Sequence, residues 1–374
     1  MEKTDVVIIG GGIIGVSVAD QLTRAGWQVT LLERREIASG ASGGNFGMLS
    51  LYERGEPWHW PMVFETMDCF SQLQQVADIG LDTCGGTIAA ANEAELQKAH
   101  AMFRPLEGTR VEFRTYTGAD VRNIEPALDA YGIVHFPQEG KLDPIQTTLH
   151  LCERSREQGM KLFLRRSVTG FGVCGHRVTK VQTDHGDIET KWVVNAAGSW
   201  ASAVSAMLGH ESPVRFHKGT AMVSQPVPPL LRGTVVGGFL TRDEGLGENS
   251  SIVTATGQSK EGSMLIAQAT QNSLLEDRDS SMEGLALVAR KYLSFFPALD
   301  SLDIIRSWAA VTPYTEDGLP VFGFHRGLEN VLTAAGFRGA FSTAPAIGAQ
   351  VVRVLHGKDS HLLRDGFSPD RNNS

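Results

Sequence analysis

The sequence predicts an α/β fold with α+β character, in which a domain of alternating strands and helices carries an inserted antiparallel-sheet domain. Three observations predict this fold class. A strand, a glycine-rich turn and a helix open the chain, a strand, loop and helix close it at residues 331–355, and short strand-like segments fill the middle. Because both ends carry the same kind of unit, we expect them to build one domain around the inserted segments.

The opening unit has the features of a dinucleotide-binding βαβ fingerprint. The apolar run Val6–Ile9 meets Gly10-x-Gly12-x-x-Gly15, and a helix-period segment follows. Gly10 permits the tight turn, Gly12 lets backbone N–H groups reach a pyrophosphate, and Gly15 lets helix and strand pack closely. The unit therefore predicts a Rossmann-type domain.

The acid that ends the second strand narrows the choice of dinucleotide. Val29–Leu32 is apolar and leads directly into Glu33, about 20 residues after the glycines. A carboxylate there accepts hydrogen bonds from ribose hydroxyls and repels a 2′-phosphate, although Arg34 and Arg35 follow it. We expect NAD or FAD in preference to NADP.

Composition excludes several classes of protein. The 374 residues are 42% hydrophobic and 20% charged, which is ordinary for a globular protein, and the length suggests two or three lobes. A net charge of −8 without a large basic block argues against a nucleic-acid partner. The sequence contains no apolar run of about 18 residues, which is the length that would predict a membrane span. Peripheral membrane attachment stays open.

The cysteines predict a reducing environment. The four of them are widely spaced and form no CxxC pair, so they indicate neither a disulfide framework nor a zinc site, and we expect no metal. The N-terminus enters its first strand without a cationic region, an apolar core and a cleavage site. We therefore expect a cytoplasmic protein.

Cap and turn signals define the remaining elements. Asn92-x-x-Glu95 predicts a helix start, and Asp143-Pro144 predicts another helix, which Gly159 ends. Further strands are expected at 86–91, 132–136, 161–164, 178–183, 191–194, 262–271 and 331–334, further helices at 57–78, 283–295 and 344–355, and loops at 118–126, which could form a short helical turn, and at 241–251. Thr343 is the expected cap of the last helix.

Two small-residue segments are candidate ligand contacts. Ile37–Ser50 is rich in Gly and Ser and can bring many N–H groups to a cofactor, with a flexible linker as the alternative. Asn195–Trp200 (NAAGSW) ends a strand with small residues that let the backbone approach a flat ligand.

Several motifs occur in an order that resembles the D-amino-acid-oxidase-like (DAO) FAD-dependent oxidoreductase superfamily, especially its glycine oxidase and sarcosine oxidase β-type branch. They are the opening fingerprint, Ala41-Ser42 to Gly47-Met48, NAAGSW, Thr315-x-Asp317-Gly318-Leu319-Pro320-Val321-x-Gly323, and Ala335–Gly339 leading to Ala344-Pro345-Ala346-x-Gly348. The resemblance covers essentially the whole chain. It implies an FAD-binding domain at 1–80, 142–215 and 305–374, and a substrate-binding domain at 81–141 and 216–304.

The resemblance also implies which residues hold the FAD. The expected contacts are Gly10, Gly12, Ile13, Ile14, Gly15, Glu33 and Arg34 at the adenosine diphosphate, Ala41, Ser42, Phe46, Gly47 and Met48 along the path to the flavin, Val168 at the adenine, Gly198, and Gly336, Phe337, Arg338, Gly339, Ala340, Phe341 and Ser342 at the isoalloxazine. Some relatives tether the flavin through Cys or His. No Cys follows Cys174 and no His precedes residue 59, so we expect non-covalent FAD.

Arg338 is the candidate catalytic-site residue for the substrate. It falls where glycine-oxidase-like enzymes place an arginine that grips the substrate carboxylate, a role that suits a guanidinium fork. A structural salt bridge is the alternative. Many relatives carry a second such arginine where this chain has Thr312, and Arg242 or Arg306 could replace it.

Other isolated residues are weaker candidates. His217 and Lys218 are more readily interpreted as structural, Tyr314 and Trp308 could wall the pocket or belong to the core, and His59 could lie over the flavin.

The resemblance implies an FAD-dependent amino acid or amine oxidase or dehydrogenase. It would oxidise the CH–NH bond of a small amino acid or secondary amine by hydride transfer to flavin N5, and the imine would hydrolyse to an oxo acid and an amine. Oxygen or a protein partner would accept the electrons. The alternatives are the catalytic β-type subunit of a dye-linked hetero-oligomeric amine or opine dehydrogenase, and a non-catalytic flavin-binding interaction protein.

Overall fold

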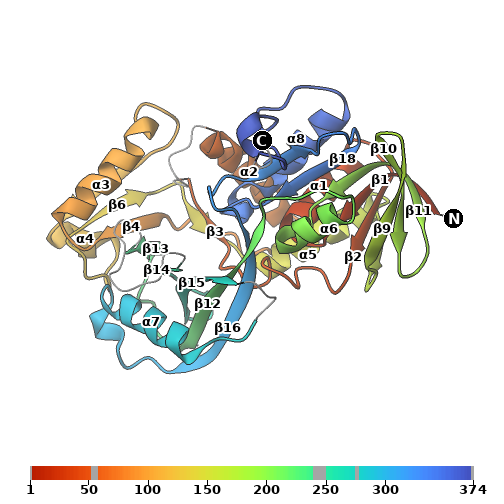
Figure 1. Ribbon diagram of the computed structural model, residues 1–374. Coiled ribbons are helices and arrows are strands. Elements are labelled where there is room, and N and C mark those ends of the chain that lie inside the picture. Colours follow the sequence, from red (N-terminus) through yellow and green to blue (C-terminus); the bar gives the residue numbers. More distant parts are fainter. Residues whose placement is uncertain (1, 52–57, 239–249, 274–277, 372–374) are drawn as a thin grey trace.

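The computed structural model describes residues 2–51, 58–238, 250–273 and 278–371. Figure 1 shows two lobes, each built around its own sheet, with the elements from both ends of the chain in one lobe. This arrangement confirms the expected fold class. Of the predicted loop at 241–251, residues 241–249 lie outside the described residues.

The first sheet is mainly parallel and is formed around the N-terminal strand. Within the described residues its order is β17-β18-β11-β1-β2-β8, and β10 and β9 extend from β11 as antiparallel neighbours. Its strands are β1 (Glu2–Ile9), β2 (Val29–Glu33), β8 (Lys161–Leu164), β9 (Val168–Cys174), β10 (Arg177–Thr183), β11 (Ile188–Asn195), β17 (Val321–Phe324) and β18 (Val331–Ala335). β1 pairs in parallel with β11 and β2, and β11 pairs in parallel with β18.

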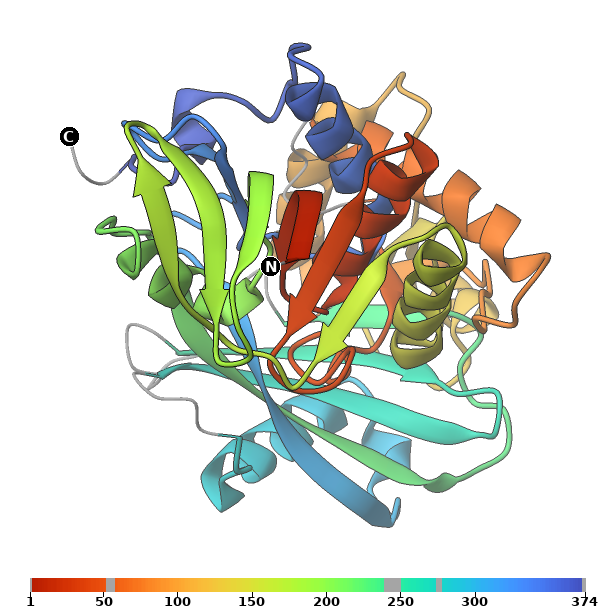
Figure 2. The same cartoon turned by 90° about the vertical axis from the view of Figure 1, so that its right-hand side faces the viewer.

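Helices cover one face of this sheet, and the hairpin of β9 and β10 lies on the other side (Figure 2). The covering helices are α1 (Ile13–Arg24), α2 (His59–Gln74), α5 (Pro144–Glu157) and α8 (Ala344–Leu355). Val6 and Ile8 of β1 pack in the same core as these helices, whereas Val7 and Ile9 pack with the hairpin. This alternation follows from the two-residue period of a strand.

The second sheet is almost entirely antiparallel. Within the described residues its order is β16-β12-β15-β14-β13-β4-β6-β5, and only the β13–β4 pair is parallel. Its strands are β4 (Gly86–Ala90), β5 (Arg114–Thr117), β6 (Gly132–Phe136), β12 (Arg215–Pro226), β13 (Thr234–Gly237), β14 (Ser250–Gln258), β15 (Ser263–Ser273) and β16 (Ile304–Tyr314). Helix α7 (Met282–Leu293) packs against β12, β14 and β15.

Short elements complete the two lobes. They are β3 (Met48–Leu49), which pairs with β7 (Gly140–Lys141), helices α3 (Glu93–Phe103), α4 (Ala119–Ile124) and α6 (Ala201–Ala206), and the 3-10 turns η2 (Arg104–Leu106), η3 (Gly198–Trp200), η4 (Pro297–Leu299), η5 (Ala340–Ser342) and η6 (Asp365–Phe367). No helix in the described ranges has the length and apolar character needed to cross a membrane.

The predicted caps of two helices are confirmed. The Asn92 side chain accepts a hydrogen bond from the backbone N–H of Glu95 at 2.9 Å, and the Glu95 carboxylate accepts one from Ala91 N–H at 2.8 Å. Asp143 caps α5 by accepting from the backbone N–H groups of Ile145 and Gln146. These side chains satisfy N–H groups that have no partner within the helix.

One expected domain boundary differs from the structure. Residues 305–314 were assigned to the first lobe, but β16 pairs antiparallel with β12 from Ile304 to Tyr314 and so belongs to the second sheet. The physical reason is that β16 extends the second sheet by a full-length ladder, and the chain returns to the first lobe only at β17.

Candidate cofactor and substrate site

A cavity of about 1270 Å³ lies where the two lobes meet. Its wall combines the glycine-rich turn and the 39–48 segment of the first lobe with strands β12, β15 and β16 of the second. The volume exceeds the roughly 300–1,000 Å³ typical of sites for one drug-sized ligand. The cavity therefore has room for a dinucleotide and a small substrate together.

The glycine-rich turn is built by close backbone approach. Gly10 has φ of +114°, and a Cβ there would overlap the carbonyl of Ala196 at the end of β11. A Cβ on Gly15 would overlap the carbonyl of Gly10. Gly15 itself does not line the cavity. Its lack of a side chain lets α1 approach β1 closely. The start of α1 therefore faces the cavity, where first-turn N–H groups attract an anion.

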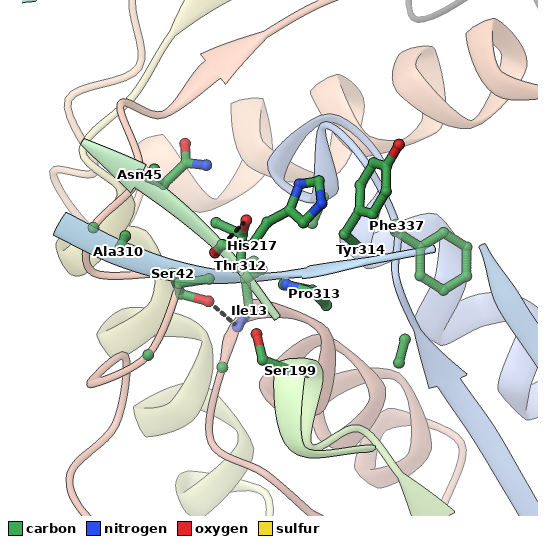
Figure 3. A pocket seen from close by; sticks show the side chains of 18 of the residues that line it. Ile13, Ser42, Asn45, Ser199, His217, Ala310, Thr312, Pro313, Tyr314 and Phe337 are labelled. Carbon is green, nitrogen blue, oxygen red and sulfur yellow. Dashed lines mark hydrogen bonds between the residues drawn. The ribbon is translucent and has the colours of Figure 1, made fainter. Parts of the chain in front are cut away.

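Ser42 holds the start of α1 in place. The backbone N–H of Ile13 donates to Ser42 Oγ at 2.9 Å (Figure 3), so this N–H has a protein partner. Gly12, Ile13, Ile14 and Ser42 all line the cavity. The backbone N–H of Ile14 is the next donor in the first turn of α1. It would donate to a pyrophosphate bound beside Gly12.

Glu33 lies at the end of β2 on the cavity wall. Its Oε2 accepts a hydrogen bond from Gly11 N–H at 2.7 Å, and its Oε1 accepts one from Arg35 N–H at 2.8 Å. The two bonds fix the carboxylate at the place expected for the ribose. A carboxylate has further lone pairs, so it can accept from ribose hydroxyls as well.

Aromatic and basic side chains gather where the adenosine is expected. The guanidinium carbon of Arg34 lies 4.1 Å from the ring centroid of Trp200, and both residues line the cavity with Val168. Arg166 is buried and donates to Thr183 Oγ1 at 2.8 Å. Arg34, Trp200 and Val168 therefore meet at one end of the cavity together with the carboxylate of Glu33.

The Gly- and Ser-rich segment is a hydrogen-bonded wall, and not the flexible linker of the alternative interpretation. Ala38 N–H donates to Gly11 O at 3.0 Å, and Trp308 Nε1 on β16 donates to Gly44 O at 3.3 Å. Ala41, Phe46 and Met48 line the cavity, but Gly47 does not.

Gly47 makes a tight backbone turn against Leu142. With φ of +69°, it turns the chain so tightly that a Cβ would overlap the Leu142 carbonyl, and its own carbonyl accepts from Leu142 N–H at 3.0 Å. It joins the cofactor wall to the start of α5.

The segment from Gly336 to Phe341, for which isoalloxazine contacts are expected, also lines the cavity. Ser342 is fully buried outside the cavity wall, and its hydroxyl accepts from Ser50 N–H at 2.8 Å. Thr343 occupies the cap position of α8, but its side chain makes no capping bond, so the expected side-chain cap is wrong. The 3-10 turn η5 runs directly into α8 and leaves Thr343 with φ of −137° and ψ of −7°.

The substrate candidate Arg338 is exposed on the cavity wall. Its guanidinium carbon lies 5.1 Å from the ring centroid of Tyr314. The Tyr314 ring stacks on His217, with centroids 3.6 Å apart and planes 14° apart, and Figure 3 shows both rings standing on the same side of the β12 and β16 strands. His217, for which a structural role is expected, lines the cavity with Tyr314.

The position of the missing second arginine is occupied by a neutral hydroxyl. Thr312 lines the cavity, and its Oγ1 donates to His217 O at 3.3 Å. Arg306 cannot replace the arginine, because it is exposed near the far end of β16. Arg242 lies outside the described residues. Arg278 does line the cavity, where it donates to Ser39 O at 3.0 Å.

His59 does not lie on the cavity wall. It is 1% exposed at the start of α2, and burial lowers its pKa to about 4. The four cysteines also lie away from the cavity.

Of the described residues, His210, His325 and Asp370 place potential ligand atoms within 4.8 Å of one another. One ring nitrogen of His325 is hydrogen-bonded to Asp370 and the other to Ser205, each at 2.8 Å. Hydrogen bonds therefore connect these residues.

The residues fit an FAD. The overlap that a Cβ would cause at Gly10, the first turn of α1 facing the cavity, the fixed carboxylate of Glu33 and a cavity larger than one small ligand requires are the features that a dinucleotide needs. When bound, FAD would supply a two-electron acceptor.

Comparisons with known proteins agree with this geometry. The family described as FAD dependent oxidoreductase (DAO) matches residues 5–354. Glycine oxidase from Geobacillus kaustophilus is 25% identical over 99% of this chain and 97% of its own length, and subunit HcnC of hydrogen cyanide synthase from Pseudomonas aeruginosa is 25% identical over 95% and 93%. Among solved structures, L-proline dehydrogenase from P. horikoshii has a TM-score of 0.90 at 25% identity, covering 100% of this chain and 98% of that one.

Proposed function

The chain belongs to the DAO family of FAD-dependent oxidoreductases, and on that premise we propose that it oxidises the CH–NH bond of a small amino acid or secondary amine. The observation that carries the proposal is the cavity itself, which joins a dinucleotide-binding turn to the guanidinium of Arg338. The first lobe would hold FAD and the second lobe the substrate, with residues 305–314 assigned to the second.

The substrate class is supported by charge and by the names of relatives. Arg338 makes no ion pair within the described part of the chain, so its guanidinium is available for an anionic group. Glycine oxidase and L-proline dehydrogenase are named for amino acids that carry a carboxylate beside the amine. With threonine at 312, one arginine would bind that carboxylate.

The residues of this chain would act by binding and orientation. Arg338 would hold the carboxylate, while the stacked rings of Tyr314 and His217 would form one side of the substrate site. Holding the α-carbon in one pose raises the rate by fixing the reacting geometry. The α-hydrogen would leave with both electrons of the Cα–H bond, for which bound FAD would be the acceptor, and the nitrogen lone pair would form the C=N bond. Water would then add to that bond and release the amine and the oxo acid.

Anaerobic reduction tests the function directly. The purified chain, loaded with FAD, is mixed without oxygen with a panel of amino acids, N-methyl amino acids and neutral amines, and loss of the oxidised flavin absorbance is followed. Bleaching by carboxylate-bearing amines is expected. No bleaching by any member of the panel, with the holoprotein intact, would contradict the proposal.

The electron acceptor separates two versions of the function. One relative is named as an oxidase and another as a subunit, so the chain could be an oxidase that uses oxygen or, as the alternative, a subunit of a hetero-oligomeric dehydrogenase that passes electrons to a partner or dye. Turnover of the isolated chain with a dye but not with oxygen is expected for the hetero-oligomeric dehydrogenase.

The four free cysteines support our proposal of a cytoplasmic location.

A further inference from the structure

We propose that Gln268 is a specificity-determining residue whose side-chain carbonyl accepts the N–H of the substrate amine. The site would then favour primary and secondary amines over tertiary amines. The inference rests on the proposed function and names the substrate class more narrowly.

Gln268 is placed in the cavity by a bulge in the second sheet. On β12, Thr220 and Ala221 are adjacent, but their partners on β15 are Ala269 and Ala267. Gln268 is therefore the extra residue between them and has no partner on β12. Bulges of this kind re-aim a side chain and are frequent beside active sites. Gln268 lines the cavity, and its side-chain amide lies beside Thr270 and Gly219, which line it too.

One hydrogen bond holds the Gln268 amide, which packs over a glycine. Nε2 of Gln268 donates to Thr270 Oγ1 at 2.7 Å. The amide lies over Gly219, where an added Cβ would be 3.1 Å from Nε2. Because the nitrogen is held by threonine, the carbonyl oxygen is the group left to accept a hydrogen bond from a ligand.

Gln268 lies in one row with the carboxylate site and the cofactor wall. On β12, Gly219 and His217 are two residues apart, so they share a face of the strand, and His217 stacks on Tyr314 beside Arg338. In the other direction, Gly219 pairs with Ala310 of β16, which contacts Gly44 in the cofactor wall. A substrate bound at Arg338 would extend its amine along this row.

The chemistry of the amine explains the preference. A neutral secondary amine has one N–H and one lone pair, so pinning the N–H to a carbonyl also fixes the direction of the lone pair that forms the C=N bond. The nitrogen gains positive charge as the hydride leaves the α-carbon for FAD, which strengthens the bond to the carbonyl in the transition state. A tertiary amine has no such hydrogen and leaves the carbonyl without a partner.

The experiment compares substrates that differ only by one N-methyl group. L-Proline with N-methyl-L-proline, and sarcosine with N,N-dimethylglycine, are used to reduce the FAD-loaded protein anaerobically. Gln268→Met keeps the length of the side chain and removes the acceptor, and Gln268→Glu keeps an acceptor. Gln271→Met, on the same strand but away from the cavity wall, is the matched control.

We expect Gln268→Met to lose about tenfold to a hundredfold in the reduction rate constant over Kd for the secondary amine, and little for the tertiary one. Gln268→Glu and Gln271→Met should retain the preference. Equal losses for both substrates in Gln268→Met, or no loss for either, would overturn the assignment while leaving the proposed function intact.

A binding measurement keeps the two proposals separable. Pyrrole-2-carboxylate, which has an N–H, and its N-methyl derivative are titrated into the oxidised holoprotein, and the shift in flavin absorbance gives each Kd without turnover. Tighter binding of the N–H compound, lost in Gln268→Met, supports the assignment even if no amine is oxidised. Equal Kd values for the two compounds in the wild-type protein would overturn it.

Discussion

Replacing Arg338 with alanine tests how the cavity recognises an anion. The guanidinium is exposed to the cavity and rests beside the Tyr314 ring, and Thr312 offers no second positive charge nearby. Removing a charge partner that is partly shielded from water costs about 2–4 kcal/mol, which is roughly thirtyfold to a thousandfold in kcat/KM. Arg338→Lys should recover only part of this, because an ammonium keeps the charge and loses the fork.

The assay is anaerobic flavin reduction with a carboxylate-bearing amine and with its neutral amide. Arg290→Ala, an exposed position on α7, is the control for general effects of losing an arginine. Loss confined to the carboxylate supports the role. An equal loss for the amide would instead indicate that the 336–341 segment has lost its shape, and unchanged rates for both substrates would refute the reasoning.

Three further predictions concern the cofactor and stability. Glu33→Ala should weaken FAD binding by about 1.5–3 kcal/mol, or tenfold to a hundredfold, and unchanged FAD retention after long dialysis would count against the ribose contact. FAD should be released intact on acid denaturation, because no cysteine of the described residues lines the cavity and the histidine on its wall, His217, is stacked on Tyr314; flavin that stays with the precipitated chain would show a covalent bond. Burial lowers the pKa of His59 to about 4, so between pH 6.5 and 4 the unfolded chain binds a proton that the folded chain does not. The free energy of unfolding should therefore fall by about 2 kcal/mol from pH 7 to pH 5 through this group, and denaturant titrations should show a flatter pH dependence in His59→Leu.

Local signals predicted the individual elements of the first lobe well, although the lobe joins segments from both ends of the chain. The turn at Gly10, the acid at Glu33 and the cap at Asp143 each depend on neighbours within a few tens of residues, and the structure has each element where the pattern predicts it. The sequence therefore sufficed for the fold and for the family.

The substrate side of the cavity depends on registers that no local pattern reveals. Gln268 reaches the cavity only because β15 has one residue more than β12 at that point, and His217 reaches it through pairing with β16. Arg278 comes from the segment before α7 and meets the first lobe at Ser39. A bulge or a long-range pairing changes which face a side chain occupies, and alternation along one strand cannot predict it.

The position of β18 in the first sheet has a consequence for how the protein is made. β11 pairs with β18, and α1 packs against α8, so the fingerprint at the start of the chain is completed by residues that are synthesised more than 300 positions later. At about 5–20 residues per second, a ribosome needs roughly 15 to 60 seconds to cover that distance. During this interval the apolar face of α1 is not yet covered by α8. The cavity wall itself is complete only after residues 334–341 have left the ribosome, because these residues form part of it.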